Sequence, residues 1–177
     1  MGNDRNLNGT RGKLAEKGET LDKADKLLSQ AEKLIPNTLE PDLPSSNFPD
    51  IPDWHDFEHK IWKCGEELRK LIKESPKLQK EDALFQRILK ISINRNAKRG
   101  RQSFIMLFDR KHFSNFAKHL ATQLDDEFVN GHVICAIQKM HVAGFESEIK
   151  SFIESKYTWI RNATKKYLTQ KNETVEQ

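Results

Sequence analysis

The sequence has little cysteine and no long apolar run. Its two cysteines, Cys64 and Cys135, stand far apart in apolar, helix-like surroundings, so we expect reduced, buried thiols rather than a disulfide-stabilised secreted fold. No stretch approaches the ~20 apolar residues that cross a bilayer. The first residues also lack the apolar centre of a signal peptide. We therefore expect a cytoplasmic protein that does not bind a membrane.

The short motifs that mark many enzymes are also missing. The sequence has no glycine-rich phosphate loop, no nucleophile elbow and no paired cysteine motif. One chemical pattern is present, His55-Asp56-Phe57-Glu58-His59, which matches the H-x-x-E-H signature of inverted zinc peptidases. That chemistry needs two imidazoles one helical turn apart and a carboxylate directed at the metal-bound water.

Three observations count against a metal site in this histidine motif. It stands in the first turns of a predicted helix, no second acidic motif follows at a recognisable spacing, and the chain is short for that enzyme class. The other interpretation is an exposed polar helix face. We expect neither an enzyme nor a cofactor, and a metal-dependent hydrolase that uses His55, Glu58 and His59 is the third hypothesis.

Charge is distributed unevenly, although the net charge is only +4 and the isoelectric point is about 9.0. Residues 31–60 carry two lysines and seven acidic residues, a balance of −5. Residues 61–100 carry eleven lysines and arginines and five acidic residues, a balance of +6. Because adjacent blocks of opposite sign attract each other, the basic residues have a possible partner within the chain as well as outside it.

The composition divides the chain into segments. Residues 1–19 are polar and without periodicity, which predicts a disordered tail. Residues 20–35 carry one narrow apolar stripe and predict an amphipathic helix, which either docks on the body or binds a partner. Residues 36–52 hold five of the six prolines and several acidic residues, which predicts a linker that lies in a groove of its own domain or docks on another protein. The helical domain is predicted over residues 53–170, followed by a polar tail over residues 171–177.

Apolar residues recur at helical spacing along the predicted domain. The first stripe runs from Trp54 to about Lys73 and ends at Ser75-Pro76. A second helix is predicted over about residues 81–93. These two helices are expected to form an antiparallel pair.

One helical pattern then occurs twice. Val129 begins a stripe with apolar residues at offsets of 4, 7, 8 and 11, and Ile160 begins a similar stripe 31 residues later. A looser third copy starts at Gly100-Arg101, and Gly144 is expected to end the helix that begins near Val129. A near-constant spacing of helix pairs is typical of an α-solenoid, although an irregular bundle with evenly spaced helices would give the same pattern.

The repeated pattern resembles the first helix of the HEAT repeat, where an aspartate precedes Val-Arg and small or apolar residues follow one and two turns later. The matching positions are Asp126, Val129-Asn130, Val133 and Ala136-Ile137, and then Ile160-Arg161, Thr164 and Tyr167-Leu168. The resemblance covers about residues 97–170, with Asn130 in place of the usual arginine. It implies an all-α fold, a short α-solenoid of antiparallel helix pairs, and a function in binding, since HEAT-like proteins are mostly scaffolds and adaptors.

Basic residues cluster at a junction between predicted helices. The residues of this junction and of the segment after it are Arg95, Lys98, Arg99, Arg101, Arg110 and Lys111. Clustered cations bind nucleic-acid phosphates with little dependence on sequence. They also suit an acidic protein surface or the chain's own acidic residues 40–58, and plain solvation is the remaining interpretation.

Two residues near the C-terminus are candidate interface anchors. Trp159 and Arg161 belong to types that are frequent at the centres of protein interfaces, although Arg161 could pair with Glu154 or Asp126 instead. We therefore predict a non-enzymatic protein-binding or adaptor module, with another protein as its partner. A nucleic-acid-binding protein that uses Arg95–Arg101 is the alternative hypothesis.

Overall fold

The computed structural model describes residues 7–170, with side chains from residue 18 onward, and this part of the chain is helical without a β-strand. The α-helices are α1 (Leu7–Leu34), α2 (Asp56–Glu74), α3 (Asp82–Ile93), α4 (Gln102–Ile105), α5 (Ala117–Ala121), α6 (Asn130–Met140), α7 (Glu146–Lys150) and α8 (Thr158–Thr169). Short 3₁₀ helices are η1 (Pro76–Lys80), η2 (Arg95–Arg101), η3 (Lys111–Phe116) and η4 (Ser151–Glu154). The all-α class is confirmed, and the predicted tail over residues 171–177 lies outside the described residues.

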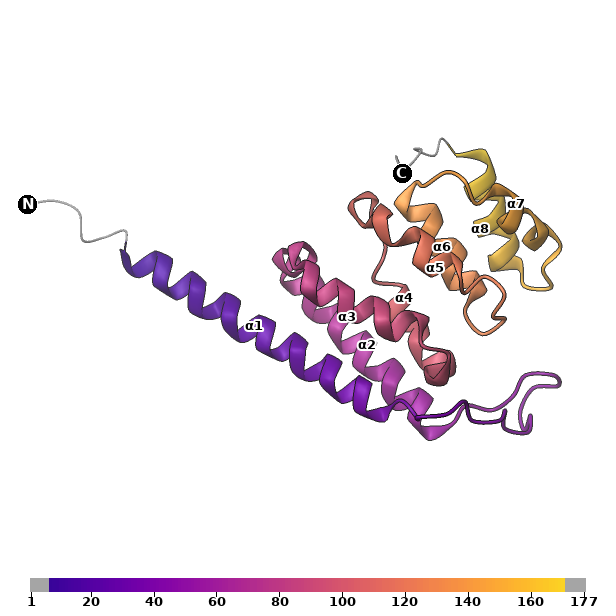
Figure 1. The fold of residues 1–177 in the computed structure, drawn as a ribbon, viewed down its shortest axis with the longest axis horizontal. Helices are drawn as coiled ribbons and strands as arrows, with labels where there is room; N and C mark the ends of the chain where they lie inside the picture. Colours follow the sequence, from indigo (N-terminus) through magenta and orange to yellow (C-terminus); the bar gives the residue numbers. More distant parts are fainter. Residues whose placement is uncertain (1–6, 171–177) are drawn as a thin grey trace, which may run out of the picture.

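Helix α1 is longer than the sequence predicted. It begins at Leu7 instead of near Thr20, so helix replaces the disordered tail from residue 7 onward, and residues 1–6 lie outside the described residues. The segment around Leu14 contains strong helix formers, and Lys23 pairs with Glu19 at 2.8 Å one turn away. Its N-terminal half extends beyond the other helices (Figure 1).

The C-terminal half of α1 packs against the body. Ala24, Leu28 and Ala31 are fully buried, and α1 contacts both α2 and α3. Arg87 of α3 donates to both carboxylate oxygens of Glu32 at 2.8 and 3.0 Å and to other α1 side chains. These hydrogen bonds raise the pKa of Arg87. Of the two alternatives for this helix, docking is the one that the structure shows.

The proline-rich segment between α1 and α2, residues 36–55, contains no helix and lies on its own domain. We call it the strap. Asn96 Nδ2 donates to Pro36 O at 3.0 Å, and Lys98 forms an ion pair with Asp42. Arg99 donates to the main-chain carbonyls of residues 52 and 53 at 2.6 and 2.5 Å. The strap is thus held near both of its ends by residues of η2.

The helices of the domain contact one another in a regular order. α2 contacts α4, α4 contacts α6, and α6 contacts α8. In addition, α3 contacts α4 and α5, α5 contacts α6, and α7 contacts α8. An aromatic cluster joins α3 to η3, where the rings of Phe85 and Phe113 stack at 4.2 Å and Phe108 meets both edge-on. Figure 1 shows α4–α8 gathered on one side of the α2–α3 pair.

The ends of the helices with the strongest apolar stripes were predicted to within a few residues. α2 ends at Glu74, as the Ser75-Pro76 break predicted, and α8 ends at Thr169. The end of α6 differs from the prediction. The helix stops at Met140, before the expected Gly144, and His141 takes the left-handed conformation with φ 57°. Within residues 7–170 no helix has both the length and the apolar character needed to cross a bilayer.

Candidate functional site

The basic junction predicted from the sequence lies largely inside the molecule. Lys98, Arg99 and Arg101 of η2 are 4, 7 and 0% exposed. Each pairs with a carboxylate from a distant part of the chain: Lys98 with Asp42, Arg99 with Glu58 at 3.1 Å, and Arg101 with Asp126, while the more exposed Arg95 pairs with Asp125 at 2.5 Å. These side chains therefore do not form an exposed basic patch.

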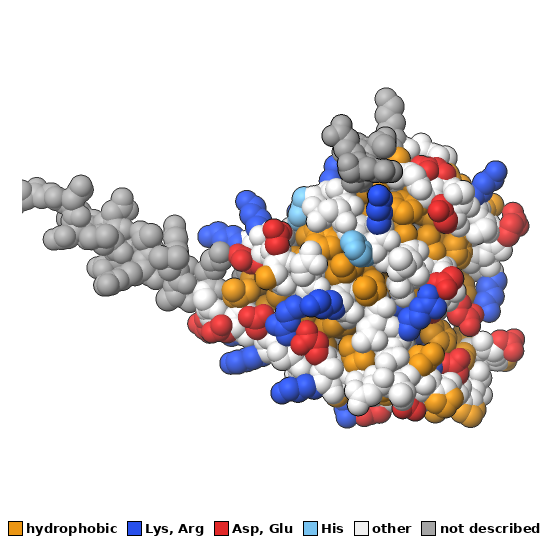
Figure 2. All heavy atoms as spheres, in the orientation of Figure 1, with side chains coloured by type: hydrophobic (Ala, Val, Ile, Leu, Met, Phe, Trp, Pro, Cys, Tyr) orange, Lys and Arg blue, Asp and Glu red, His pale blue; other side chains and the backbone are white. Residues whose placement is uncertain are grey.

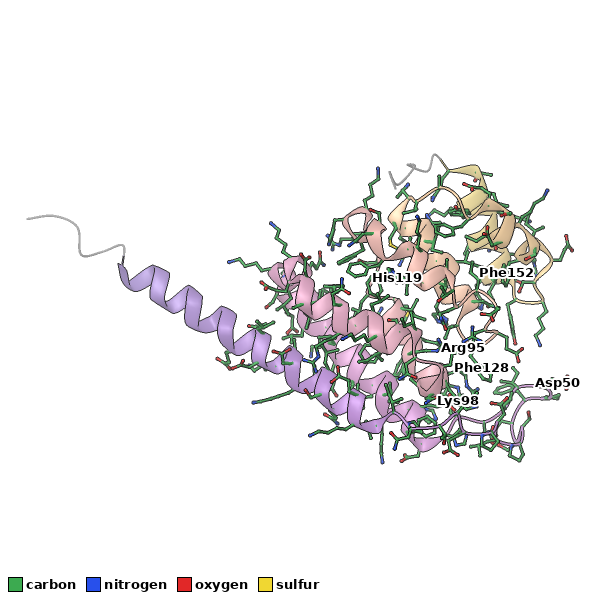
Figure 3. The ribbon with its side chains drawn as sticks, viewed as in Figure 1. Asp50, Arg95, Lys98, His119, Phe128 and Phe152 are labelled. Atoms are coloured by element: carbon green, nitrogen blue, oxygen red, sulfur yellow. The ribbon has the colours of Figure 1, made fainter. Side chains whose placement is uncertain are left out.

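Burial explains why Lys98, Arg99 and Arg101 each have a carboxylate partner. Moving a guanidinium or ammonium group out of water costs several kcal/mol, which only an ion pair with further hydrogen bonds offsets. Lys98 also lies 5.4 Å from the centroid of the Phe128 ring, and Arg99 lies over the rings of Trp54 and Phe128 at 5.1 and 5.2 Å. Figure 3 labels Lys98 and Phe128, which lie close to each other. The predicted pairing with the chain's own acidic residues 40–58 holds for Lys98 and Arg99, whereas Arg95 and Arg101 pair with carboxylates outside that segment.

Gly100 lets η2 lie directly against α2. A Cβ at this position would stand 2.8 Å from the carbonyl oxygen of Glu58 and 2.9 Å from Ile61 Cβ. Neither the backbone nor a packed β-branched residue can move aside easily. The close approach places Arg99 beside the buried carboxylate of Glu58.

The histidine motif lies at the start of α2, and its side chains do not converge on a common point. His55 is the N-cap of α2, and its main-chain N–H donates to Glu58 Oε1 at 3.0 Å. Glu58 is fully buried, and its Oε2 accepts from the main-chain N–H and Nε of Arg99. His55 Nε2 contacts a strap carbonyl at 2.8 Å, and His59 stacks on Trp54. Among the side chains of residues 18–170, no three His, Cys, Asp or Glu residues form a cluster that could hold a metal ion.

Arg110 and Lys111 are separated from the η2 cations by the fold. Both are exposed, on the segment that leads from α4 into η3. Arg110 lies 3.6 Å from its neighbour Asp109 and lines a groove shared with the last turns of α2. The predicted basic set is therefore divided between an internal network and the molecular surface.

A cleft of about 220 Å³ lies between the strap and the start of α8. Ile51 of the strap lines one side and is 39% exposed, whereas Tyr157 and Trp159 line the other and are 38 and 45% exposed. Phe128 and Gly131 contribute to the lining between them. We call this site the aromatic cleft. Large apolar side chains that stay in contact with water around one cleft are typical of a binding site.

The strap wall of the aromatic cleft is a closed loop. The main-chain N–H of Asp53 donates to Pro44 O at 3.4 Å, and Ser46 Oγ donates to the Asp53 carboxylate. Within the loop, Ile51 N donates to Phe48 O at 3.2 Å. Phe48 is 67% exposed. Figure 3 labels Asp50, which lines the cleft and has a positive φ of 64°, at the outer end of this loop.

The opposite wall depends on a glycine. A Cβ on Gly131 of α6 would overlap Trp159 Cη2 and stand 2.7 Å from Ile160 Cγ1. The absence of a side chain allows α8 to lie against α6 at this point. Trp159 also meets the ring of His132 edge-on, with the two centroids 5.2 Å apart. The indole is therefore held in place while much of its surface faces solvent.

Two polar groups stand inside the aromatic cleft. Asn130 Oδ1 is buried and has no hydrogen-bond partner among the described residues. Burial lowers the pKa of His132 to about 4, so its imidazole is neutral at neutral pH. A neutral imidazole offers one donor and one acceptor, and the amide oxygen offers an acceptor. Asp50, Glu127 and Lys156 add charge to the lining.

Arg161 forms neither of the two ion pairs that the sequence suggested for it. Its Nη1 donates to Ser155 O at 2.6 Å, and its Nη2 donates to Thr158 Oγ1 at 2.8 Å. It forms no ion pair with Glu154 or Asp126, because its guanidinium is used to fix the turn that leads into α8. Trp159, in contrast, lines the aromatic cleft.

The half-buried imidazole of His132 predicts a pH-dependent stability. Because the folded-state pKa of His132 is about 4 and its ordinary value is 6.5, the unfolded chain binds the proton first as the pH falls. This residue is expected to remove up to about 3 kcal/mol of stability between pH 6.5 and pH 4. Urea denaturation of wild type and His132→Gln at several pH values measures this contribution, and His119→Gln on an exposed position is the control. Equal pH dependence in wild type and His132→Gln would contradict the assignment.

The sequence singled out two residues of the aromatic cleft, Trp159 as a candidate interface anchor and Arg99 as part of the basic junction. Ile51 belonged to the predicted linker, Asn130 was a departure from a repeat motif, and Tyr157 was not singled out. An aromatic residue just before a helix, at Tyr157, was the signal available for the second wall. Comparison with known proteins adds no relative, since no family model, no curated protein and no solved structure matches this chain.

Proposed function

We propose that this protein is a non-enzymatic protein-binding module and that the aromatic cleft is its docking site. The observation that carries the proposal is the exposure of Ile51, Tyr157 and Trp159 around one cleft, at 39, 38 and 45%. Tyrosine and tryptophan supply large contact areas at a low cost in side-chain entropy, and they are frequent energetic centres of interfaces. Desolvating them against a partner would give the apolar part of the binding free energy.

The cleft favours a protein segment with one bulky apolar side chain and a hydrogen-bond donor. The side chain would enter between Ile51 and Trp159, and an N–H of the segment would reach the unpartnered Asn130 Oδ1. A buried acceptor without a partner destabilises the free protein, so satisfying it on binding adds affinity. Lys156 at the edge of the cleft would orient charged residues that flank the segment.

We infer further that the scaffold is a short HEAT-like array. Support comes from the order in which α2, α4, α6 and α8 contact one another, and from the match of α6 and α8 to the two better copies of the sequence pattern. The helices of the third copy depart from the repeat, since α4 has only 4 residues. An array of this kind suits an adaptor, because loops and helix starts at one edge form a surface for a partner.

The other two functions have less support. A nucleic-acid surface at Arg95–Arg101 would need exposed cations, and three of these side chains are less than 8% exposed and paired with carboxylates. Basic and acidic side chains are interspersed on the face drawn in Figure 2. A hydrolase would need the Glu58 carboxylate near a metal-bound water, and both of its oxygens accept hydrogen bonds from the main chain.

Replacing Tyr157 and Trp159 together with alanine is expected to weaken partner binding strongly. A nuclease-treated lysate is passed over the tagged full-length chain, and the retained protein is identified and then titrated in purified form. We expect an affinity loss of at least about 30-fold for the double variant, as for the removal of an interface hot spot. Trp62→Ala is the matched control, because Trp62 is 36% exposed on α2 and does not line the cleft.

Two outcomes would overturn the proposal. The same protein could be retained with equal affinity by wild type, the control and the double variant, which would place the docking site elsewhere. Alternatively, retention could disappear with nuclease treatment in all three, which would favour the nucleic-acid hypothesis.

A further inference from the structure

A second surface groove lies on another part of the molecule. It has a volume of about 680 Å³ and runs between the last turns of α2 and the segment that follows α4. Arg69, Lys70 and Lys73 line it from α2, and Arg110 lines it from the opposite side. We call it the basic groove. No residue of the aromatic cleft takes part in it, so the two sites are separate.

The cations of the basic groove are only partly neutralised. Four basic side chains face two carboxylates, those of Glu66 and Asp109. Arg69 pairs with Glu66 at 2.5 Å, and Arg110 lies 3.6 Å from Asp109. Lys70 and Lys73 are exposed and form no ion pair with the side chains of residues 18–170. The groove therefore has an excess of positive charge that an acidic ligand would complement.

The interior of the basic groove is apolar. Ile72 and Leu107 are 5 and 6% exposed, and Met106 is half-buried beside them. An unbranched thioether such as that of Met106 adapts to apolar groups of different shapes. Cations above an apolar floor match a segment in which acidic residues alternate with large apolar ones.

One buried acceptor in the basic groove lacks a partner. Glu66 Oε2 accepts from Arg69, whereas Glu66 Oε1 is buried and has no hydrogen-bond partner among the described residues. A peptide in the groove could donate a main-chain N–H to this oxygen. A buried carboxylate oxygen without a donor is unfavourable, so this contact would add to affinity.

Nucleic acid fits the basic groove less well than a peptide does. Proteins that bind single strands stack the bases on aromatic side chains, and no aromatic residue lines this groove. We propose that the basic groove binds an acidic segment of a partner protein that carries apolar anchor residues.

The proposal is tested with the full-length chain and a fluorescently labelled peptide of repeated Glu-Glu-Leu units, by anisotropy. We expect saturable binding that weakens as salt increases. Lys70→Glu combined with Lys73→Glu is expected to weaken binding at least ~10-fold, since two attractive charges become repulsive. The matched control is Lys118→Glu combined with Lys165→Glu, which makes the same change of charge at exposed positions outside the groove.

A thermal melt shows whether each variant is folded. Arg110→Glu, from the other side of the groove, provides a second test that leaves α2 unchanged, and it should weaken binding of the same peptide. The proposal is wrong if wild type does not bind the peptide, or if the control pair weakens binding as much as the groove pair. Tighter binding of a labelled oligothymidine than of the peptide would also overturn it. These outcomes do not depend on Trp159, so the aromatic cleft can fail or succeed by itself.

Discussion

The variant Glu58→Gln is expected to lose about 3–5 kcal/mol of the free energy of unfolding. Glu58 is fully buried, and its carboxylate accepts from the N-terminal end of its own helix and from Arg99. Glutamine would keep the shape but would leave the buried guanidinium without a counter-charge and point an amide donor at existing donors. The melting temperature should fall by roughly 10 °C for a chain of this size.

Urea denaturation at neutral pH measures the effect of Glu58→Gln. Glu67→Gln is the control, because Glu67 is an exposed residue of the same helix and such surface changes are usually within about 0.5 kcal/mol. If the two variants were equally stable, the Glu58–Arg99 pair would not contribute to stability. Binding at the basic groove can be measured separately, since its lining includes neither Glu58 nor Arg99, whereas Arg99 lines the aromatic cleft.

Arg101→Leu is expected to have a destabilising effect of similar size, about 3–5 kcal/mol. Arg101 is fully buried, donates to the carbonyl oxygens of Lys98 and Ser92 at 3.1 and 3.3 Å, and donates to Gln123 Oε1 at 2.7 Å. Its guanidinium also pairs with Asp126. Leucine would leave all four acceptors without their donor.

A double-mutant cycle with Asp126→Asn isolates the ion pair. Asparagine keeps the Oδ1 acceptor that the main-chain N–H of Phe128 uses at 2.9 Å. Burial lowers the pKa of Arg101, and the charge of Asp126 opposes that shift, so removing the carboxylate alone leaves a cation in an unfavourable site. The double variant should be more stable than the sum of the two single losses by about 1–3 kcal/mol. Strict additivity would show that the charges do not interact.

The helices with continuous apolar stripes were predictable because helical periodicity is a local property of the chain. In α2, Ile61 and Leu68 are fully buried, and in α6 the same holds for Val133 and Ile137. The region after η2 was harder to predict. Its apolar residues Phe104, Leu107 and Phe108 are buried, but α4 ends after 4 residues and an irregular turn follows. There the packing of the aromatic cluster decides the backbone path.

The basic junction shows why charge patterns predict so little by themselves. Four cations within Arg95–Arg101 look like a surface patch when they are read along the chain. In the structure their carboxylate partners come from the strap, from α2 and from the segment before α6. Whether a charge faces solvent or a counter-charge depends on residues that are distant in sequence. The sequence therefore left several interpretations of the junction open, and the structure was needed to distinguish them.

The sequence by itself determined that this chain is helical, where its strongest helices lie, and that an acidic and a basic block follow each other. Tertiary structure alone decided that α1 docks, that the strap closes over η2, and that Ile51 meets Tyr157 and Trp159 across a cleft. The reason is physical: an apolar stripe depends on neighbours a few positions away, whereas exposure and ion pairing depend on distances through space.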